Sequence, residues 1–252
     1  MHLIQCRLRP AELIRFARTQ GLADKWDSDL GYAAHAMLQG LFGELAPRPF
    51  RLMSGSGGGH GHNAEQRLVH GRSQRLQLLG YCAHGAEDLR DHAGMFALPD
   101  AYQCLVMDSL ASKPLPRRWP RGRQLGFEVL CCPIARRKDV EKDMFLWAVE
   151  DAHESATLHR LEVYQRWLSH QLGEAASVVS AELAAFRLIR MLRRNHPGED
   201  KPRTGKGLQR PQALFSGVLE ITDETAFEHV LSRGVGRHRA FGHGMLLLRP
   251  AS

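Results

Sequence analysis

Gly234-Val-Gly-Arg-His-Arg-Ala-Phe-Gly-His-Gly-Met-Leu-Leu-Leu248 is the stretch of this chain that most restricts its fold and function. Glycine lets a main chain approach a ligand closely and direct successive N–H groups toward an anion, and Arg237 and Arg239 add fixed positive charge. The combination suits a phosphate backbone. It does not fit a dinucleotide, because the run is not Gly-x-Gly-x-x-Gly between a strand and a helix. The glycines assigned to this loop are Gly234, Gly236, Gly242 and Gly244.

The residues around this run predict the elements of the second half of the chain. Apolar spacing and capping residues set their bounds. In chain order we expect a strand at Gln124–Ile134, an amphipathic helix at Leu158–Leu172, a segment at Ala184–Leu192 that periodicity leaves open between strand and helix, a strand at Ala213–Ile221, a helix capped by Asp223 and running through Leu231, and a closing strand at Met245–Leu248.

The first half shows the same alternation. Gly55–His62 is too rich in glycine to hold regular structure and is expected to be a mobile connection, and its two histidines are too few for a structural metal site. The expected elements are a strand at His2–Leu8, a helix starting at Pro10, a helix at Leu30–Phe42 ended by Gly43, a strand at Arg75–Cys82 and a short helix at Glu87–Ala97.

A basic, proline-rich stretch separates the halves. Ser109–Arg123 contains four arginines, one lysine and three prolines but no acidic residue, which is typical of a stiff linker. We therefore divide the chain into a first domain at 1–108, a linker at 109–123 and a second domain at 124–252. Each half runs roughly strand, helix, strand, strand, helix, strand, so the fold class is α+β with tandem ferredoxin-like (RRM-like) domains.

Composition narrows the class of partner. The net charge of +7 and the pI near 9.5 favour a polyanion, with solubility alone as the alternative. Five cysteines without a Cys-x-x-Cys pair indicate neither a disulfide framework nor a zinc site. No segment approaches the ~20 apolar residues of a membrane span, so we expect a cytoplasmic protein without a membrane partner. No signature of a metal or cofactor site is evident.

Several motifs together resemble one family. Arg233-Gly-Val-Gly236, Ala240-Phe-Gly-His-Gly244 and Leu248-Arg-Pro250 look like the C-terminal glycine-rich loop of the CRISPR-associated CasE endoribonucleases of the RAMP superfamily. Phe215–Asp223 resembles the penultimate strand of that family, Glu162–Leu168 its mid-chain helix, and Asp29-Leu-Gly-Tyr-Ala-Ala-His35 its active-site motif on the first long helix. The resemblance covers both ends and the second half of the chain.

The resemblance implies a fold, a substrate and partners. The family has two ferredoxin-like domains, cuts precursor CRISPR RNA at the base of each repeat hairpin without metal, and stays bound to the crRNA product in an effector complex with other Cas proteins. The ribose 2′-OH attacks its own phosphate, leaving a 2′,3′-cyclic phosphate and a 5′-hydroxyl. The host system is left open between type I-E and type IV.

Tyr32 and His35 are the expected catalytic residues. They are three apart on the predicted helix, so their side chains share one face, and histidine titrates near neutral pH. Taken without the family motif, both residues also suit ordinary packing at a helix–sheet junction. Related type IV proteins rely on arginines, which leaves Arg237 and Arg239 as transition-state stabilisers if His35 is not the base.

A second basic stretch is expected to bind RNA. It lies between the second and third strands of the second half, where it either tracks phosphates or forms a solvated face. Its residues are Arg193, Arg194, Lys201, Arg203, Lys206 and Arg210.

Three other functions compete with the nuclease. A non-cleaving RAMP-type subunit would bind crRNA without cutting it, and Tyr32 with His35 in one helix argue against it. An unrelated ferredoxin-like RNA-binding module would carry exposed aromatic RNP motifs, which are absent. A small-molecule enzyme is disfavoured because no nucleotide, flavin or metal signature is present.

Overall fold

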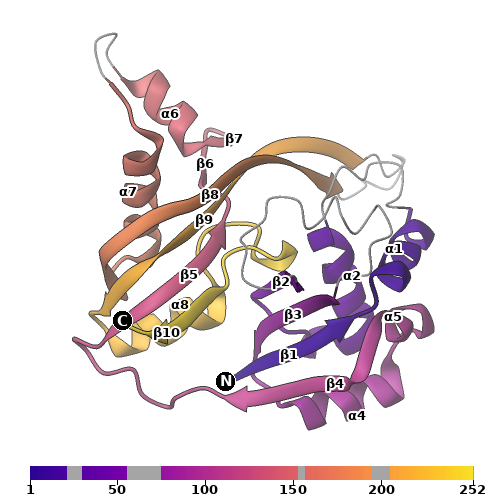
Figure 1. Ribbon diagram of the computed structural model, residues 1–252. Helices are drawn as coiled ribbons and strands as arrows, with labels where there is room; N and C mark the ends of the chain where they lie inside the picture. The colour runs from indigo at the N-terminus through magenta and orange to yellow at the C-terminus, as the bar shows by residue number, and fades with distance from the viewer. Residues whose placement is uncertain (22–29, 56–74, 153–156, 195–204, 252) are drawn as a thin grey trace.

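The computed structural model describes residues 1–21, 30–55, 75–152, 157–194 and 205–251. Two four-stranded antiparallel sheets lie side by side, each covered by helices (Figure 1). The first sheet has the strand order β2-β3-β1-β4 and the second has the order β10-β5-β9-β8. In both, the first and third strands of the domain lie in the centre and the second and fourth lie at the edges. The predicted tandem ferredoxin-like fold is confirmed.

The first domain follows the predicted alternation closely. Ile4, Cys6 and Leu8 alternate with exposed residues along the first strand and face the core, and Pro10 starts the first helix. Its elements are β1 (His2–Leu8), α1 (Pro10–Thr19), α2 (Leu30–Phe42), the 3-10 turn η2 (Gly43–Leu45), β2 (Phe50–Gly55), β3 (Arg75–Cys82), α4 (Ala86–Phe96), α5 (Pro99–Cys104) and β4 (Leu105–Pro114).

The second domain repeats this order with an inserted hairpin and helix. Asp223 caps α8 as predicted, since its carboxylate accepts the Ala226 amide. The elements are β5 (Gln124–Cys131), β6 (Ile134–Arg137), β7 (Val140–Asp143), α6 (Met144–Asp151), α7 (Arg160–Leu172), β8 (Ala176–Arg194), β9 (Gly205–Ile221), α8 (Glu224–Arg233), the 3-10 turn η3 (Arg239–Phe241) and β10 (Leu246–Pro250).

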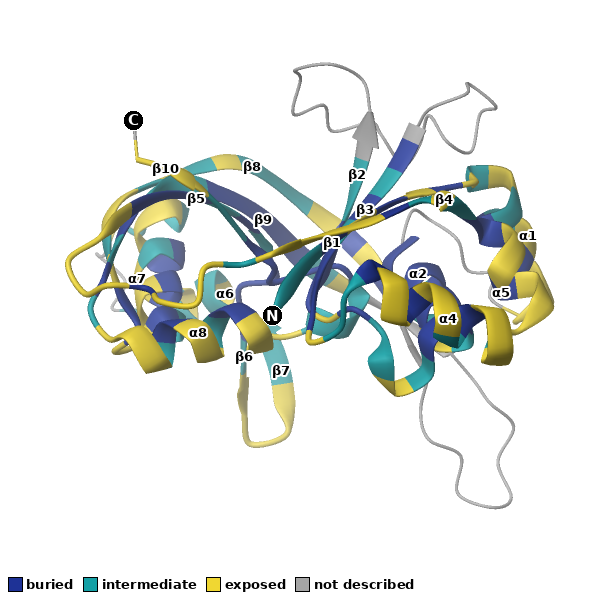
Figure 2. Ribbon diagram, turned by 90° about the horizontal axis from the view of Figure 1, so that it is seen from below, coloured by how far each residue is buried: buried dark blue, intermediate teal, exposed yellow. Residues whose placement is uncertain are grey.

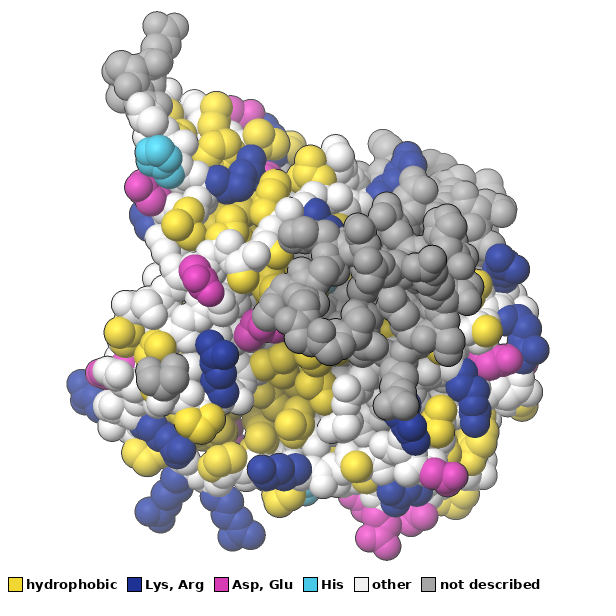
Figure 3. Space-filling model, in the orientation of Figure 1, with side chains coloured by type: hydrophobic (Ala, Val, Ile, Leu, Met, Phe, Trp, Pro, Cys, Tyr) yellow, Lys and Arg dark blue, Asp and Glu magenta, His cyan; other side chains and the backbone are white. Residues whose placement is uncertain are grey.

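Each domain has its own apolar core. Leu13, Met37 and Leu78 are fully buried in the first, and Phe127, Tyr164 and Phe215 in the second. Figure 2 shows the consequence for the helices: α2 is buried along most of its length, whereas α4 and α8 expose their outer faces. The exposed large apolar side chains of the described residues include Leu146 and Val149 on α6, and hydrophobic side chains gather over that helix in Figure 3.

The predicted linker begins too early. Ser109–Pro114 belongs to β4, which pairs with β1 up to the His2–Pro114 register position. Because β4 is an edge strand, its terminal proline does not interrupt the ladder. The connection between the sheets is therefore 115–123, and Trp119 within it is buried against Phe227 of the second core.

One further expectation in the second half is corrected, and one open assignment is decided. The strand expected at Gln124–Ile134 ends at Cys131, and Ile134 begins the separate β6–β7 hairpin. The segment left open at Ala184–Leu192 is a strand, part of the long β8 that pairs with β9 and arches from the second domain to above α2 (Figure 1). The connection expected at Gly55–His62 lies outside the described residues apart from Gly55, which ends β2.

None of the helices in the described part of the chain has both the length and the apolar character required to cross a membrane.

Candidate functional site

Tyr32 and His35 stand on one face of α2, as their spacing predicted. Their ring centroids are 6.4 Å apart in an edge-to-face arrangement, and both side chains are half-buried. The opposite face of α2 is held in the first core by Ala34 and Met37, which are fully buried. The core thus fixes the rotation of the helix and leaves this pair facing the second domain.

Phe241 of the second domain packs against both residues. Its ring stacks on Tyr32 with the centroids 5.4 Å apart and the planes at 15°, and it meets His35 edge-on at 5.3 Å and 84°. Phe241 belongs to the η3 turn inside the glycine-rich loop. The candidate site therefore lies where the two domains meet, with catalytic candidates from one and an aromatic support from the other.

Two further contacts hold the domains in this register. The Tyr81 hydroxyl of β3 donates a hydrogen bond of 2.7 Å to the Leu246 carbonyl of β10, deep in the interface. Arg51 of β2 forms an ion pair of 2.6 Å with Glu128 of β5, and its side chain is largely buried. Side chains from the four-stranded sheets of both domains therefore set the position of η3 relative to α2.

The glycine-rich loop is shaped by close backbone packing. Gly234, Gly236, Gly242 and Gly244 all have positive φ, which favours glycine. At Gly244 an added Cβ would lie 2.3 Å from the Val235 carbonyl oxygen, and at Gly236 it would lie 2.9 Å from the Trp167 ring. Neither position accepts a larger residue without displacement of the loop.

The expectation that the loop amides point toward an anion is wrong for four of them. The Gly234 amide donates to the Val230 carbonyl, Val235 to Gly244, Phe241 to His238 and Gly244 to Leu130, at 2.7 to 2.8 Å. These bonds close the loop on itself and on β5. The loop brings Arg237, Arg239 and Phe241 to the interface, and its charge lies in the arginine side chains.

One buried carboxylate organises the basic residues beside the loop. Glu141 on β7 has 9% of its side chain exposed, accepts a hydrogen bond of 2.9 Å from Arg210 and forms an ion pair of 2.8 Å with Arg237. His238 Nε2 lies 3.6 Å from the same carboxylate. The His238 imidazole, followed by the two guanidinium groups, lowers the pKa of Glu141 to about 2. Glu141 is therefore ionised at any physiological pH.

Burial lowers the pKa of His35, and the positive charge of Arg48 lowers it further. His35 is therefore mainly neutral at neutral pH, the form that accepts a proton. The pKa of Arg239 is also lowered, first by burial and then by Arg233, Arg48 and Arg237. Several guanidinium groups therefore lie close enough to Arg239 to affect its charge, a setting that favours an incoming phosphate.

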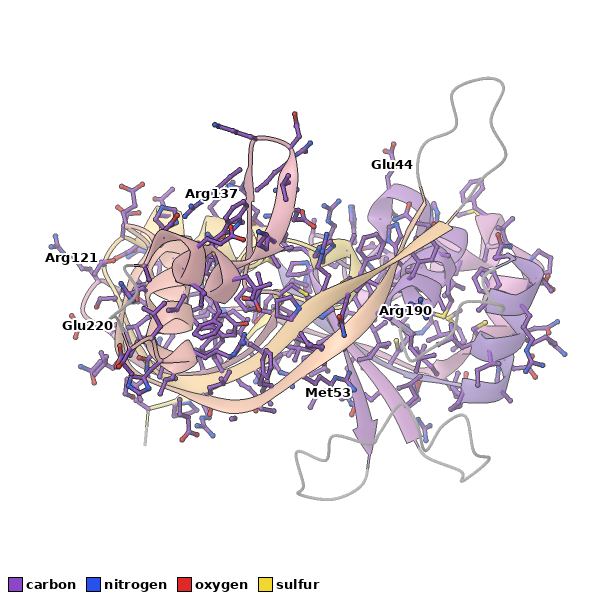
Figure 4. All side chains as sticks on the ribbon, turned by 90° about the horizontal axis from the view of Figure 1, so that it is seen from above. Glu44, Met53, Arg121, Arg137, Arg190 and Glu220 are labelled. Carbon is purple, nitrogen blue, oxygen red and sulfur yellow. The ribbon has the colours of Figure 1, made fainter. Side chains whose placement is uncertain are left out.

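The predicted RNA-binding residues lie along the β8–β9 hairpin. Arg193, Arg194 and Lys206 are on its strands, although their side chains lie outside the described residues, and Arg210 on β9 forms an ion pair with Glu141 of β7. The described parts of this stretch, 193–194 and 205–210, are strand where a loop was expected, and Lys201 and Arg203 lie outside the described residues. Figure 4 shows Arg190 on the hairpin near the junction of the domains and Arg121 at the far end of the second domain.

Sequence reasoning did not assign a role to Phe241, Arg48, Glu141 or His238. Phe241 lies inside the glycine-rich run, and its aromatic side chain was the sequence signal that could have identified it. Glu141 and Arg48 carried none, because their partners are distant in sequence. Among residues with described side chains, no group of three His, Cys, Asp or Glu is arranged as metal ligands would be.

The fold and the interface site together define a tandem ferredoxin-like protein with a glycine-rich loop packed on the first long helix. The sequence pattern of the family described as CRISPR associated protein matches residues 1–250. The chain belongs to this family. A comparison with curated proteins gave no match.

Solved structures agree with this assignment of fold. A structure of CRISPR endoribonuclease Cse3 bound to a 19-nucleotide RNA aligns with a TM-score of 0.60 at 19% identity, covering 99% of this chain and 100% of that one. Cas6e from Escherichia coli str. K-12 aligns at 0.50 and 18% identity over the whole of both chains. A chain of a CRISPR RNA-guided surveillance complex aligns at 0.52 and 13%, covering 98% of this chain and 100% of that one.

Proposed function

We propose that this protein is a metal-independent endoribonuclease that binds the CRISPR repeat hairpin and cuts precursor CRISPR RNA. The observation that carries the proposal is the placement of Tyr32 and His35 on one face of α2, against Phe241 of the glycine-rich loop. The likeness to an endoribonuclease bound to RNA supports it. The family and the basic surface favour RNA as the substrate.

The proposed chemistry uses the neutral form of His35 as the base. Neutral His35 removes the proton of the ribose 2′-OH, whose oxygen attacks the adjacent phosphorus. The bond to the 5′ oxygen breaks, and the Tyr32 hydroxyl protonates that oxygen. The products are a 2′,3′-cyclic phosphate and a 5′-hydroxyl. Arg239, whose pKa is lowered first by burial and also by the nearby charge of Arg48, stabilises together with Arg48 the charge that develops on the phosphate.

The RNA duplex is held by charge along the β8–β9 hairpin and the glycine-rich loop. Arg237 is about half exposed although its Nε pairs with Glu141, so the exposed part of its guanidinium group can reach a phosphate. Arg210 contributes positive charge beside Arg237, because both side chains pair with the Glu141 carboxylate. The other phosphate contacts come from the hairpin residues Arg193, Arg194 and Lys206, and from Lys201 and Arg203 in the segment beyond the described strands.

The product crRNA stays bound and joins a complex with other Cas proteins. Support comes from the alignment with a chain of a surveillance complex. The prediction is that the cleaved hairpin dissociates slowly from the protein, measured as a single turnover per protein molecule when substrate is in excess. Rapid multiple turnover would contradict this part of the proposal.

The test is incubation of the protein with a repeat hairpin in excess EDTA. The wild type should cut once and leave a cyclic phosphate. His35→Ala and Tyr32→Phe should each slow single-turnover cleavage by about 10²- to 10⁴-fold with little change in hairpin affinity. Matched controls are His229→Ala on α8 and Tyr102→Phe on α5, both exposed and on helices other than α2.

Two results would overturn the proposal. If the hairpin is cut only when divalent ions are added, the reaction depends on metal. Tight hairpin binding without any cleavage would instead support a non-cleaving crRNA-binding subunit.

A further inference from the structure

His243 is buried in the glycine-rich loop and takes no part in the chemistry proposed above. Its side chain is 3% exposed, and both ring nitrogens have partners. Nδ1 lies 3.1 Å from the Phe241 carbonyl oxygen, and Nε2 lies 3.0 Å from Nε2 of Gln212 on β9. Gln212 is 8% exposed and accepts a hydrogen bond from Arg187 Nε on β8. A chain of hydrogen bonds thus runs from the hairpin to the turn that carries Phe241.

The donors along this chain are fixed by chemistry. An arginine guanidinium has no acceptor, so the Gln212 atom that faces Arg187 is its carbonyl oxygen. Gln212 therefore turns its NH₂ toward His243, and His243 Nε2 must accept. The imidazole proton is consequently on Nδ1 and is donated to the Phe241 carbonyl.

The turn needs such an anchor. η3 is a single 3-10 turn of three residues. It is flanked by His238 at φ 60° and Gly242 at φ 81°, both left-handed. Gly242 has little intrinsic preference for that conformation. The hydrogen bond from His243 spans Gly242 and restrains the carbonyl of the residue whose ring contacts Tyr32 and His35.

We propose that His243 and Gln212 are positioning residues, which hold Phe241 so that its ring fixes Tyr32 and His35 for cleavage. This inference rests on the proposed nuclease function. Burial, with a smaller contribution from His238, lowers the pKa of His243 to about 3, so the imidazole stays neutral and the donor pattern persists throughout the working pH range.

The test compares two substitutions of similar polarity. In His243→Asn the side-chain NH₂ takes the place of Nδ1–H and still reaches the Phe241 carbonyl. In His243→Gln the amide reaches toward Gln212 and the donor to Phe241 is lost. We expect H243N to cut within about threefold of the wild type and H243Q about tenfold more slowly, the rate equivalent of one hydrogen bond. Both should bind the hairpin with unchanged affinity.

A double-mutant cycle separates positioning from general packing. In a Phe241→Ala background, replacing His243 with glutamine should cause no further loss of rate, because the residue through which it acts is gone. A persisting tenfold loss in that background would overturn the inference. So would H243Q cutting as fast as the wild type, or H243N as slow as H243Q at equal thermal stability.

An NMR measurement decides the inference independently of cleavage. In the wild type and H243N, nuclear Overhauser contacts between the Phe241 and Tyr32 rings should be present, and in H243Q they should weaken. If the wild type cuts no hairpin, the nuclease proposal fails, and these contacts still test the positioning of Phe241. If both variants fail to fold, Gln212→Met takes their place: His243 Nε2 loses its donor from Gln212, and the contacts between the Phe241 and Tyr32 rings should weaken. Unchanged ring contacts in Gln212→Met would contradict the proposed chain.

Discussion

Replacing Phe241 with alanine removes one ring that contacts both catalytic candidates. The ring stacks on Tyr32 at 5.4 Å and meets His35 edge-on at 5.3 Å. Aromatic pairs contribute about 0.5–1.5 kcal/mol each beyond the area they bury, so the two contacts together restrain the site by about 1–3 kcal/mol. If that restraint acts on the transition state, cleavage slows by about 5- to 150-fold.

The assay is single-turnover cleavage of a repeat hairpin with protein in excess, alongside equilibrium binding of a non-cleavable hairpin. Affinity should stay within about twofold, because Phe241 lies against protein side chains on α2. Phe96→Ala on α4 is the matched control, since Phe96 is 67% exposed and its ring packs on His92, outside the Tyr32, His35 and Phe241 cluster. An unchanged rate for Phe241→Ala, or a loss confined to binding affinity, would refute the reasoning.

Three other predictions follow from the same contacts. Because burial and Arg48 lower the pKa of His35, cleavage should rise with pH to a plateau with its midpoint below 6.5, and Arg48→Ala should move the midpoint upward in a pH–rate profile. In denaturant titrations, Gly244→Ala should lower the free energy of unfolding by about 1–3 kcal/mol or more. Gly94→Ala, in open space on α4, should instead raise it by about 0.5–1 kcal/mol. Glu141 has its pKa lowered from 4.5 to about 2, so it stabilises the fold above pH 4.5 and loses this contribution as pH falls toward 2; Glu141→Gln should flatten that part of the acid-denaturation curve.

The order of elements was predictable because local patterns carry it. Alternation in His2–Leu8, the helical spacing of Leu30–Phe42 and the capping carboxylate of Asp223 each act within a few residues. The bounds were wrong where pairing over distance decides. Ser109–Pro114 has the composition of a linker but extends a strand, because β1 offers it a partner about a hundred residues away.

The candidate site was predictable in the same partial way. Tyr32 and His35 were found because their spacing and their motif are local to one helix. The aromatic support from Phe241 depends on how one domain docks on the other, and no pattern within the glycine-rich run encodes that contact. The pairing of Glu141 with Arg210 and Arg237 joins three separate segments. The sequence indicated the positive charges but not the carboxylate that binds two of them.

The central claim is that the RNA supplies its own nucleophile, a ribose hydroxyl activated at the interface between the domains. It is tested most directly with a repeat hairpin that carries a single 2′-deoxy sugar at the scissile position, incubated in EDTA beside the all-ribose hairpin. The account predicts equal binding of both and cleavage of the all-ribose hairpin only. Cleavage of the deoxy-substituted hairpin at the same position would contradict it.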